Sequence, residues 1–227
     1  GMNGRRVYWP RGKTLGGSSA INGLIYIRGQ REDFDDWREA GNPGWGYDDL
    51  LPWFKRSEAN VRGADAFHGA DGPLAVSDIG QPHELVEAFI AGAGEQGVPR
   101  NDDFNGATQE GAGYYQLTTR HGLRCSTAVG YLGPARASEQ LAVLTGAQAL
   151  GLVLQGRRAV GVRYARGGVE QEAHARAEVI VCAGAIQSPQ LLQLSGIGPA
   201  EHLQALGIPV VHDLPGVGEN LQDHLQV

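Results

Sequence analysis

The stretch RGKTLGGSSAINGLIYIRG, from Arg11 to Gly29, combines two adjacent glycines, two serines and two upstream cations. Glycine allows the backbone to approach a phosphate closely, serine hydroxyls and amides can donate to phosphate oxygens, and cations offset the phosphate charge. We therefore expect a diphosphate cradle at Gly16–Ser19, with Arg11 and Lys13 beside it. On these residues alone the alternative remains open, because a Gly-Gly-Ser-Ser segment is more often an ordinary turn.

The composition is that of a globular protein with an unusual amount of glycine. The 227 residues are 41% hydrophobic and include 35 glycines, about twice the average proportion. The glycines follow no repeating period, so we interpret most of them as turns and some as points of close approach to a bulky cofactor. A net charge of −6 provides no basic field for nucleic acid, and we predict no nucleic-acid partner.

The cysteines and the first residues indicate a cellular setting. Cys125 and Cys182 cannot form a disulfide framework, and no Cys/His spacing predicts a zinc site, so we expect a reducing cytoplasm and no metal. The start, GMNGRRVYWP, has no apolar run after its basic residues. It therefore predicts neither a signal peptide nor a membrane span.

The first half of the sequence predicts helices separated by glycine-rich loops. Phe34 and Trp37 share one face of a helix over 31–41, and Leu50, Leu51 and Phe54 share one face of a second over 47–58. We expect several further features in this half of the sequence. These are a cap by Asp48 or Asp49 on the second helix, a loop over 61–80 with a strand at 74–76, a solvated rather than metal-bound His68 and Asp71, and a helix over 83–96.

Gly92, Gly94 and Gly97 match the G-x-G-x-x-G dinucleotide fingerprint letter by letter. That motif requires its glycines at a turn from a strand to the start of a helix, where amides face the pyrophosphate. Here the glycines lie at the predicted end of a helix with no strand before them. We interpret the match as coincidental.

From residue 141 onward the pattern changes to short apolar runs typical of a β-meander, with a Gly-Gly hairpin turn at 167–168. The continuous apolar run EVIVCAGA, 178–185, predicts a strand buried on both faces. SPQLLQLSG predicts a helix capped by Ser188 with Pro189 at its first position, and a short helix at 198–206 and a brief strand follow.

Several segments together resemble the glucose-methanol-choline (GMC) oxidoreductases, flavoenzymes that oxidise alcohols. The likeness runs through Arg11–Gly29, DFDDWREAGNPGWGYDDLLPWFKRSE, QEGAGYYQLTTRHGLRCSTAVGYL, LAVLTGAQA, GAIQSPQLLQLSGIGP and LPGVGENLQDH, in the family's usual order. The resemblance implies a mixed α/β fold: an incomplete FAD-binding domain, residues 1–227, with a β-meander and peripheral helices.

The resemblance also implies where FAD would lie. It would place Gly16, Gly17, Ser18, Ser19, Asn22 and Gly23 along the diphosphate and flavin ring, with the cation Arg11 upstream. Ala149 would meet the adenine through its backbone, and Ala183 and Gly184 would pass near the cofactor. Some choline-oxidising relatives carry a flavin-linked histidine at the position of Ile21, and isoleucine has no nucleophilic atom, so the FAD is expected to be noncovalent.

The family's first G-x-G-x-x-G βαβ unit and its C-terminal histidine base have no counterpart in these residues, so we predict no catalytic residue. His202, His212 and His224 are expected to be surface or loop residues. The implied reaction is oxidation of a primary alcohol to an aldehyde by hydride transfer to flavin, with oxygen or a quinone-like carrier as electron acceptor. YYQLTTRHGLRCS resembles alcohol- and aromatic-alcohol-oxidising members more than choline dehydrogenases. A choline dehydrogenase-like enzyme and a noncatalytic fragment that binds a complementing partner remain as alternatives.

Overall fold

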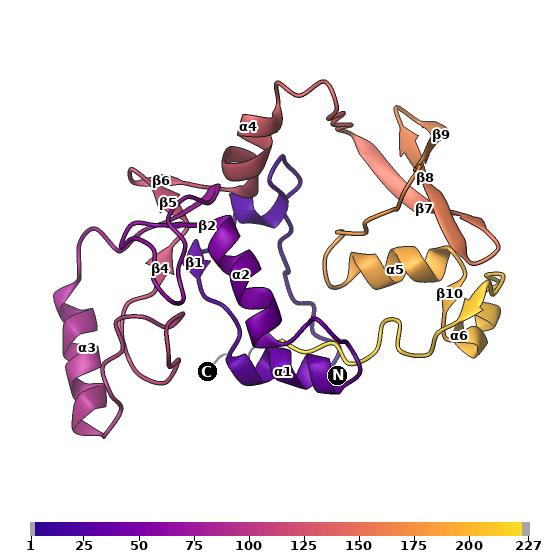
Figure 1. The fold of residues 1–227 in the computed structure, drawn as a ribbon. Helices are drawn as coiled ribbons and strands as arrows, with labels where there is room; N and C mark the ends of the chain where they lie inside the picture. Colours follow the sequence, from indigo (N-terminus) through magenta and orange to yellow (C-terminus); the bar gives the residue numbers. More distant parts are fainter. Residues whose placement is uncertain (1–2, 224–227) are drawn as a thin grey trace. The chain divides into compact units, whose positions relative to one another are not determined.

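The computed structural model describes residues 3–223, and the chain divides after Leu141 into two compact units (Figure 1). The first unit contains helices and two-residue or three-residue strands, and the second contains a three-stranded sheet and two short helices. The predicted mixed α/β class is confirmed. No described helix is long and apolar enough to cross a membrane.

The first unit contains the predicted helices and strand. The sequence-predicted helix over 83–96 is confirmed, and the ring of His83 accepts a hydrogen bond from the amide of Leu85 at its start. Gly92 and Gly94 lie in the last part of that helix and Gly97 lies just after it, so these glycines are not at the start of a helix, where the dinucleotide motif requires them. The elements are η1 Gly17–Ala20, β1 Ile25–Tyr26, α1 Arg31–Glu39, α2 Tyr47–Ser57, β2 Glu58–Asn60, β3 Leu74–Val76, α3 Glu84–Glu95, β4 Gln116–Leu117, β5 Thr119–Arg120, β6 Leu123–Arg124, η2 Ala128–Leu132 and α4 Gly133–Ala135.

The short strands of the first unit form three separate pairs, of which β5 with β6 is a local hairpin and β1 with β4 joins distant parts of the sequence. β2 pairs in parallel with β3, β1 pairs with β4, and β5 pairs with β6. The N-cap of α2 is Gly46 rather than an aspartate, although the carboxylate of Asp49 accepts a hydrogen bond from the Gly46 amide at 3.1 Å. Asp48 instead forms two hydrogen bonds with the exposed guanidinium of Arg31.

The second unit confirms the β-meander. Gly167 and Gly168 have φ of 60° and 80°, as a two-residue turn between antiparallel strands requires. A short parallel pair and two helices complete the unit. The elements are β7 Ala147–Gln155, β8 Arg158–Arg166, β9 Val169–His174, α5 Gln187–Leu194, β10 Ile197–Gly198, α6 Ala200–Ala205 and β11 His212–Asp213.

Three predictions for the second unit are wrong. Residues 178–185 form no strand, and Ile180 is 75% exposed, because no described segment supplies the neighbouring backbone that a two-sided buried strand needs. Ser188 does not cap α5, and Pro189 is the third residue of this helix rather than the first. The helix begins at Gln187 with Ile186 as its N-cap, and the Ser188 hydroxyl oxygen accepts a hydrogen bond from the amide of Ala183 instead.

The first unit is organised around a fully buried carboxylate. The side chain of Glu58, at the end of α2, is 0% exposed and pairs with the guanidinium of Arg28 at 2.5 Å. It also accepts hydrogen bonds from the side chain of Asn60 at 2.8 Å and from the amide of Gly69 at 3.4 Å, and lies 3.0 Å from Nδ1 of His68. A buried charge is costly unless it is paired and hydrogen-bonded, so these segments must come together for the unit to fold.

We expect the substitution Glu58→Gln to lower the free energy of unfolding by about 3–5 kcal/mol, because it leaves the buried Arg28 guanidinium without a counter-ion. Urea unfolding followed by tryptophan fluorescence measures the effect, since Trp9, Trp37, Trp45 and Trp53 all belong to the first unit. The matched control is Asp48→Asn, which removes an exposed ion pair and is expected to have a much smaller effect. Equal losses in the two variants would contradict the central role of Glu58.

Candidate functional site

The Gly16–Asn22 loop, residues 16–22, takes a conformation that requires glycine. Gly16 and Gly17 have φ of 89° and 54°, and the 3-10 helix η1 follows directly. A Cβ added to Gly12 would collide with the carbonyl oxygen of Gly17, so the chain before the loop touches it directly. In contrast, added Cβ atoms at Gly17 and Gly23 would meet nothing within 4 Å. The backbone at these two positions therefore borders open space that a ligand could approach.

The two serines of the loop have different roles. The hydroxyl of Ser19 donates to the carbonyl oxygen of Gly16 at 2.5 Å and accepts from the amide of Thr127 at 2.9 Å, so it is occupied within the protein. The hydroxyl oxygen of Ser18 accepts from the amide of Gly12 at 3.3 Å, and this leaves its own hydrogen available. Of the two, Ser18 is the hydroxyl that can donate to a phosphate oxygen.

The loop ends at a strained residue. Leu24 has a φ of 69°, which is unfavourable for a side chain of its size. Its amide donates to the side-chain oxygen of Asn22 at 3.2 Å, and its carbonyl accepts from Thr118 through both the amide and the hydroxyl. Such strain persists only where the surroundings enforce it, and it clusters at binding sites. Arg11 lies apart from these contacts, with its guanidinium 5.1 Å from the ring centre of Trp9.

Two residues that sequence reasoning missed hold this loop. The guanidinium of Arg124 donates to the side-chain oxygen of Asn22 at 2.6 Å and to the carbonyl oxygen of Ser19 at 3.1 Å. The hydroxyl of Thr127 donates to the carbonyl oxygen of Gly16 at 3.2 Å. The available signal was the LRCST segment at 123–127, which the sequence analysis treated only as a family landmark.

The remaining predicted cofactor residues, Ala149, Ala183 and Gly184, belong to the second unit. Ala149 lies on β7 next to a register shift before Gly151, and the Leu152 amide donates to the Ser195 hydroxyl at the end of α5 at 2.8 Å. Gly184 has a φ of 92°, and an added Cβ there would meet nothing within 4 Å. Immediately after it, a pocket of about 710 Å³ lies between the first turn of α5 and residues 218–222. An accessible backbone next to a pocket is suited to contact with a large cofactor.

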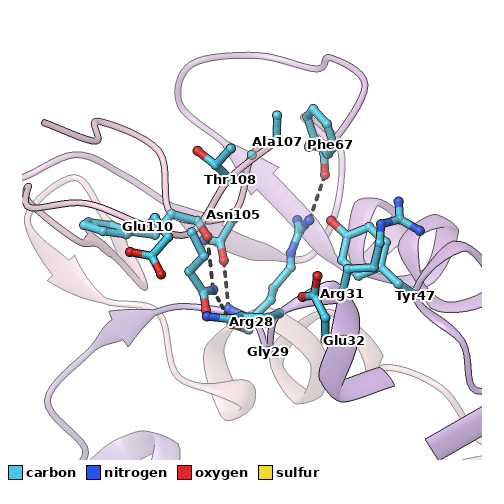
Figure 2. A pocket seen from close by; sticks show the side chains of 14 residues that line it. Arg28, Gly29, Arg31, Glu32, Tyr47, Phe67, Asn105, Ala107, Thr108 and Glu110 are labelled. Atoms are coloured by element: carbon cyan, nitrogen blue, oxygen red, sulfur yellow. Dashed lines mark hydrogen bonds between the residues drawn. The ribbon is translucent and has the colours of Figure 1, made fainter. Parts of the chain in front are cut away.

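A second pocket, of about 480 Å³, lies in the first unit around Arg28 (Figure 2). The Arg28 amide donates to the side-chain oxygen of Asn105 at 2.7 Å, and the side chain of Gln109 donates to the Arg28 carbonyl at 2.9 Å. Figure 2 shows the Arg28 guanidinium reaching the carbonyl oxygen of Phe67, at 2.8 Å. These bonds fix the wall of the pocket and continue into the network around Glu58.

Comparison with known proteins decides the family. A family model described as GMC oxidoreductase matches residues 1–226. The chain belongs to the GMC oxidoreductase family. The comparisons include relatives with high sequence identity to this chain. They also include solved structures of the same fold, among them a FAD-dependent oxidoreductase.

The chain is 50% identical over 231 residues to the oxygen-dependent choline dehydrogenase of Pseudomonas fluorescens, and covers 41% of that protein. It is 46% identical over 227 residues to human mitochondrial choline dehydrogenase, of which it covers 38%. In both cases the whole of this chain is matched. The GMC chain therefore spans about two fifths of the length of these curated relatives.

Solved structures agree with this assignment. Pyridoxine 4-oxidase from Mesorbium loti superposes with a TM-score of 0.88 at 36% identity, over 98% of this chain and 44% of that chain. A FAD-dependent oxidoreductase from Chaetomium thermophilum gives 0.91 at 30% identity, over 98% of this chain and 41% of that chain. The fold of this GMC chain is therefore that of the FAD-binding region of larger flavoproteins.

The other histidines of the GMC chain divide into exposed and buried residues. His202 lies on α6 and borders the pocket of the second unit, and His212 lies beside the guanidinium of Arg157. His224 lies outside the described residues. The prediction of a solvated His68 is wrong, whereas Asp71 is exposed as expected. No cluster suited to a metal ion occurs among residues 3–223.

His68 lies between two carboxylates, with Nδ1 3.0 Å from Glu58 and Nε2 3.0 Å from Asp103. Burial opposes the charged imidazole, but the hydrogen bonds to Asp103 and Glu58 outweigh it and raise the pKa of His68 above its ordinary value. Protonated His68 can donate to both carboxylates at once. Its charge therefore offsets part of the buried negative charge of Glu58.

Because the folded pKa is raised, the stabilisation by His68 is complete below its ordinary pKa of 6.5 and is lost as the pH rises through the raised value. We expect the urea midpoint of the first unit, measured by tryptophan fluorescence, to fall across this range. His68→Gln keeps a hydrogen-bonding side chain without the titration, and should remove this part of the pH dependence. Parallel curves for the two proteins would refute the assignment.

Proposed function

We propose that this chain forms the FAD-facing part of an enzyme that oxidises a primary alcohol to an aldehyde. The observation that carries the proposal is the glycine-dependent Gly16–Asn22 loop with the strained Leu24 after it, where the backbone borders open space at Gly17 and Gly23. Membership of the GMC family supplies the identity of the ligand. Bound FAD would accept the hydride that leaves the alcohol carbon.

In this proposal the loop residues Gly16, Gly17, Ser18, Ser19, Asn22 and Gly23, with Arg11 upstream, contact FAD in the first unit, and Ala149, Ala183 and Gly184 contact it in the second. Ser18 donates its free hydroxyl hydrogen, while Ser19 keeps the loop in shape. The FAD is noncovalent, because the side chain of Ile21 has no nucleophilic atom. We assign no catalytic base to the described residues.

The substrate class that the comparisons favour is a choline-type alcohol. The choline dehydrogenases are 50% and 46% identical to this chain, and the pyridoxine oxidase is 36% identical. A fungal aryl-alcohol oxidase is 26% identical. These values support the choline-like alternative over an aromatic alcohol. The name of the first relative also supports oxygen as the acceptor, with a quinone-like carrier as the other candidate.

A second candidate is a noncatalytic module that binds a complementing chain. Residues 178–185 favour it, because they are mostly apolar and mostly exposed, and pair with no strand among the described residues. A segment of this kind is a template for strand addition. The two candidates differ in whether the purified chain alone retains FAD.

We expect the purified chain to bind FAD and to release all of it on acid precipitation, as a noncovalent cofactor does. Gly17→Ala should weaken binding about tenfold, measured by quenching of flavin fluorescence, because its methyl group enters the space assigned to FAD. Gly156→Ala is a matched control, since Gly156 has a similar φ of 57° and also faces open space. A protein that takes up no FAD, or equal affinities in the two variants, would refute the proposed contact.

For the complete gene product that carries this sequence, we expect kcat/KM for choline to exceed that for benzyl alcohol by at least about tenfold. Turnover with oxygen and with an artificial acceptor identifies the electron acceptor, and heat-treated protein is the control. The 227-residue chain alone is expected to show no turnover, because it is assigned no base. A preference for benzyl alcohol would overturn the choline-type assignment.

A further inference from the structure

The segment Arg124–Thr127 binds the Gly16–Asn22 loop from more than a hundred residues away in the sequence. Arg124 donates three hydrogen bonds, of 2.6 Å to the Asn22 side-chain oxygen, 2.8 Å to the Asn22 carbonyl and 3.1 Å to the Ser19 carbonyl. Thr127 adds an amide bond of 2.9 Å to the Ser19 hydroxyl and a hydroxyl bond of 3.2 Å to the Gly16 carbonyl. Both ends of the loop are therefore held by one short segment.

The contacts of Arg124 are unusual for a half-buried arginine. All the bonds given for its guanidinium go to neutral oxygens of the loop, and within residues 3–223 no carboxylate forms an ion pair with it. Among the described residues, its positive charge therefore has only neutral oxygens of the loop as partners. An arginine with these partners holds the oxygens of the loop in place, because its charge strengthens each hydrogen bond that it donates.

The segment Arg124–Thr127 and the following Ala128 pack closely against Gly16. A Cβ added to Gly16 would lie 3.2 Å from both the Cβ of Ala128 and the hydroxyl of Ser126. The segment is itself fixed by the buried Cys125, whose amide donates to Thr118 at 2.9 Å and whose sulfur lies 3.5 Å from the amide of Ala75 on β3. The loop thus packs against a segment that is itself bonded to Thr118 and to β3.

We propose that Arg124 and Thr127 are positioning residues for the FAD-binding loop, with Arg124 orienting the side chain of Asn22 and Thr127 fixing the carbonyl of Gly16. This inference rests on the proposed function. Neither residue is assigned a contact with FAD. Their effect passes through the loop, because each holds the backbone that would meet the cofactor in a geometry that is strained at Leu24.

The test uses the purified chain, with FAD affinity and the urea midpoint of the FAD-free protein as separate readouts. Arg124→Met keeps the aliphatic stem but removes every donor, and should weaken FAD binding about tenfold or more. Arg120→Met is the matched control, since Arg120 lies on the neighbouring strand β5 and makes one long bond, of 3.3 Å, to Pro73. Arg120→Met should bind FAD like the wild type. Its urea midpoint should be similar to that of Arg124→Met.

Thr127→Val has the same shape without the hydroxyl, and should weaken FAD binding about threefold to tenfold. Thr127→Ser restores the hydroxyl and should restore affinity, which a purely steric role would not predict. Wild-type affinity in Arg124→Met, or a loss of affinity matched by an equal loss of stability in the FAD-free protein, would overturn the proposal.

A readout without FAD separates this inference from the proposed function. Hydrogen exchange of the amides at residues 16–24 should be faster in Arg124→Met than in Arg120→Met, because the hydrogen bonds from Arg124 to the loop are lost. If the wild type takes up no FAD, the proposed function fails, while hydrogen exchange still tests whether Arg124 holds the loop. Equal exchange in the two variants would overturn the positioning role.

Discussion

The buried carboxylate of Glu58 is the constraint on which the first unit depends. An ionised group without solvent contact must recover its lost hydration from cations and hydrogen-bond donors. Glu58 obtains them from Arg28, Asn60, His68 and Gly69, which lie in three different parts of the chain. Hydrophobic burial in this unit is modest, and many large apolar side chains remain exposed. The polar network therefore specifies how these segments meet.

The same network reaches the proposed cofactor loop from two directions. Arg28 is the second-last residue of the stretch from Arg11 to Gly29, so its pairing with Glu58 fixes the chain that follows the loop. β2, which starts at Glu58, pairs with β3, and β3 contacts Cys125 within the segment that binds the loop. A substitution of Glu58 would therefore disturb the conformation of the loop through both connections.

Local patterns in the sequence were sufficient to predict the helices over 31–39 and 84–95 and the β-meander, because helix periodicity and glycine turns act over a few residues. The glycine-dependent loop was also predictable from its residue types. The strand predicted at 178–185 failed, since an apolar run shows that a segment can pair but does not supply the partner. His68 and Glu58 were beyond prediction, because a polar residue becomes buried only through partners distant in sequence. Arg124 was missed for the same reason.

The glycines of the loop also set different limits on protein engineering. Gly12 and Gly16 are enclosed by protein atoms, and Gly17 is restricted by its backbone conformation. Gly23 is outside the left-handed region that restricts Gly17, and its missing side chain would point into open space. A combinatorial library that varies Gly23 and keeps Gly12, Gly16 and Gly17 would therefore change the residues that line the site without changing the backbone of the loop.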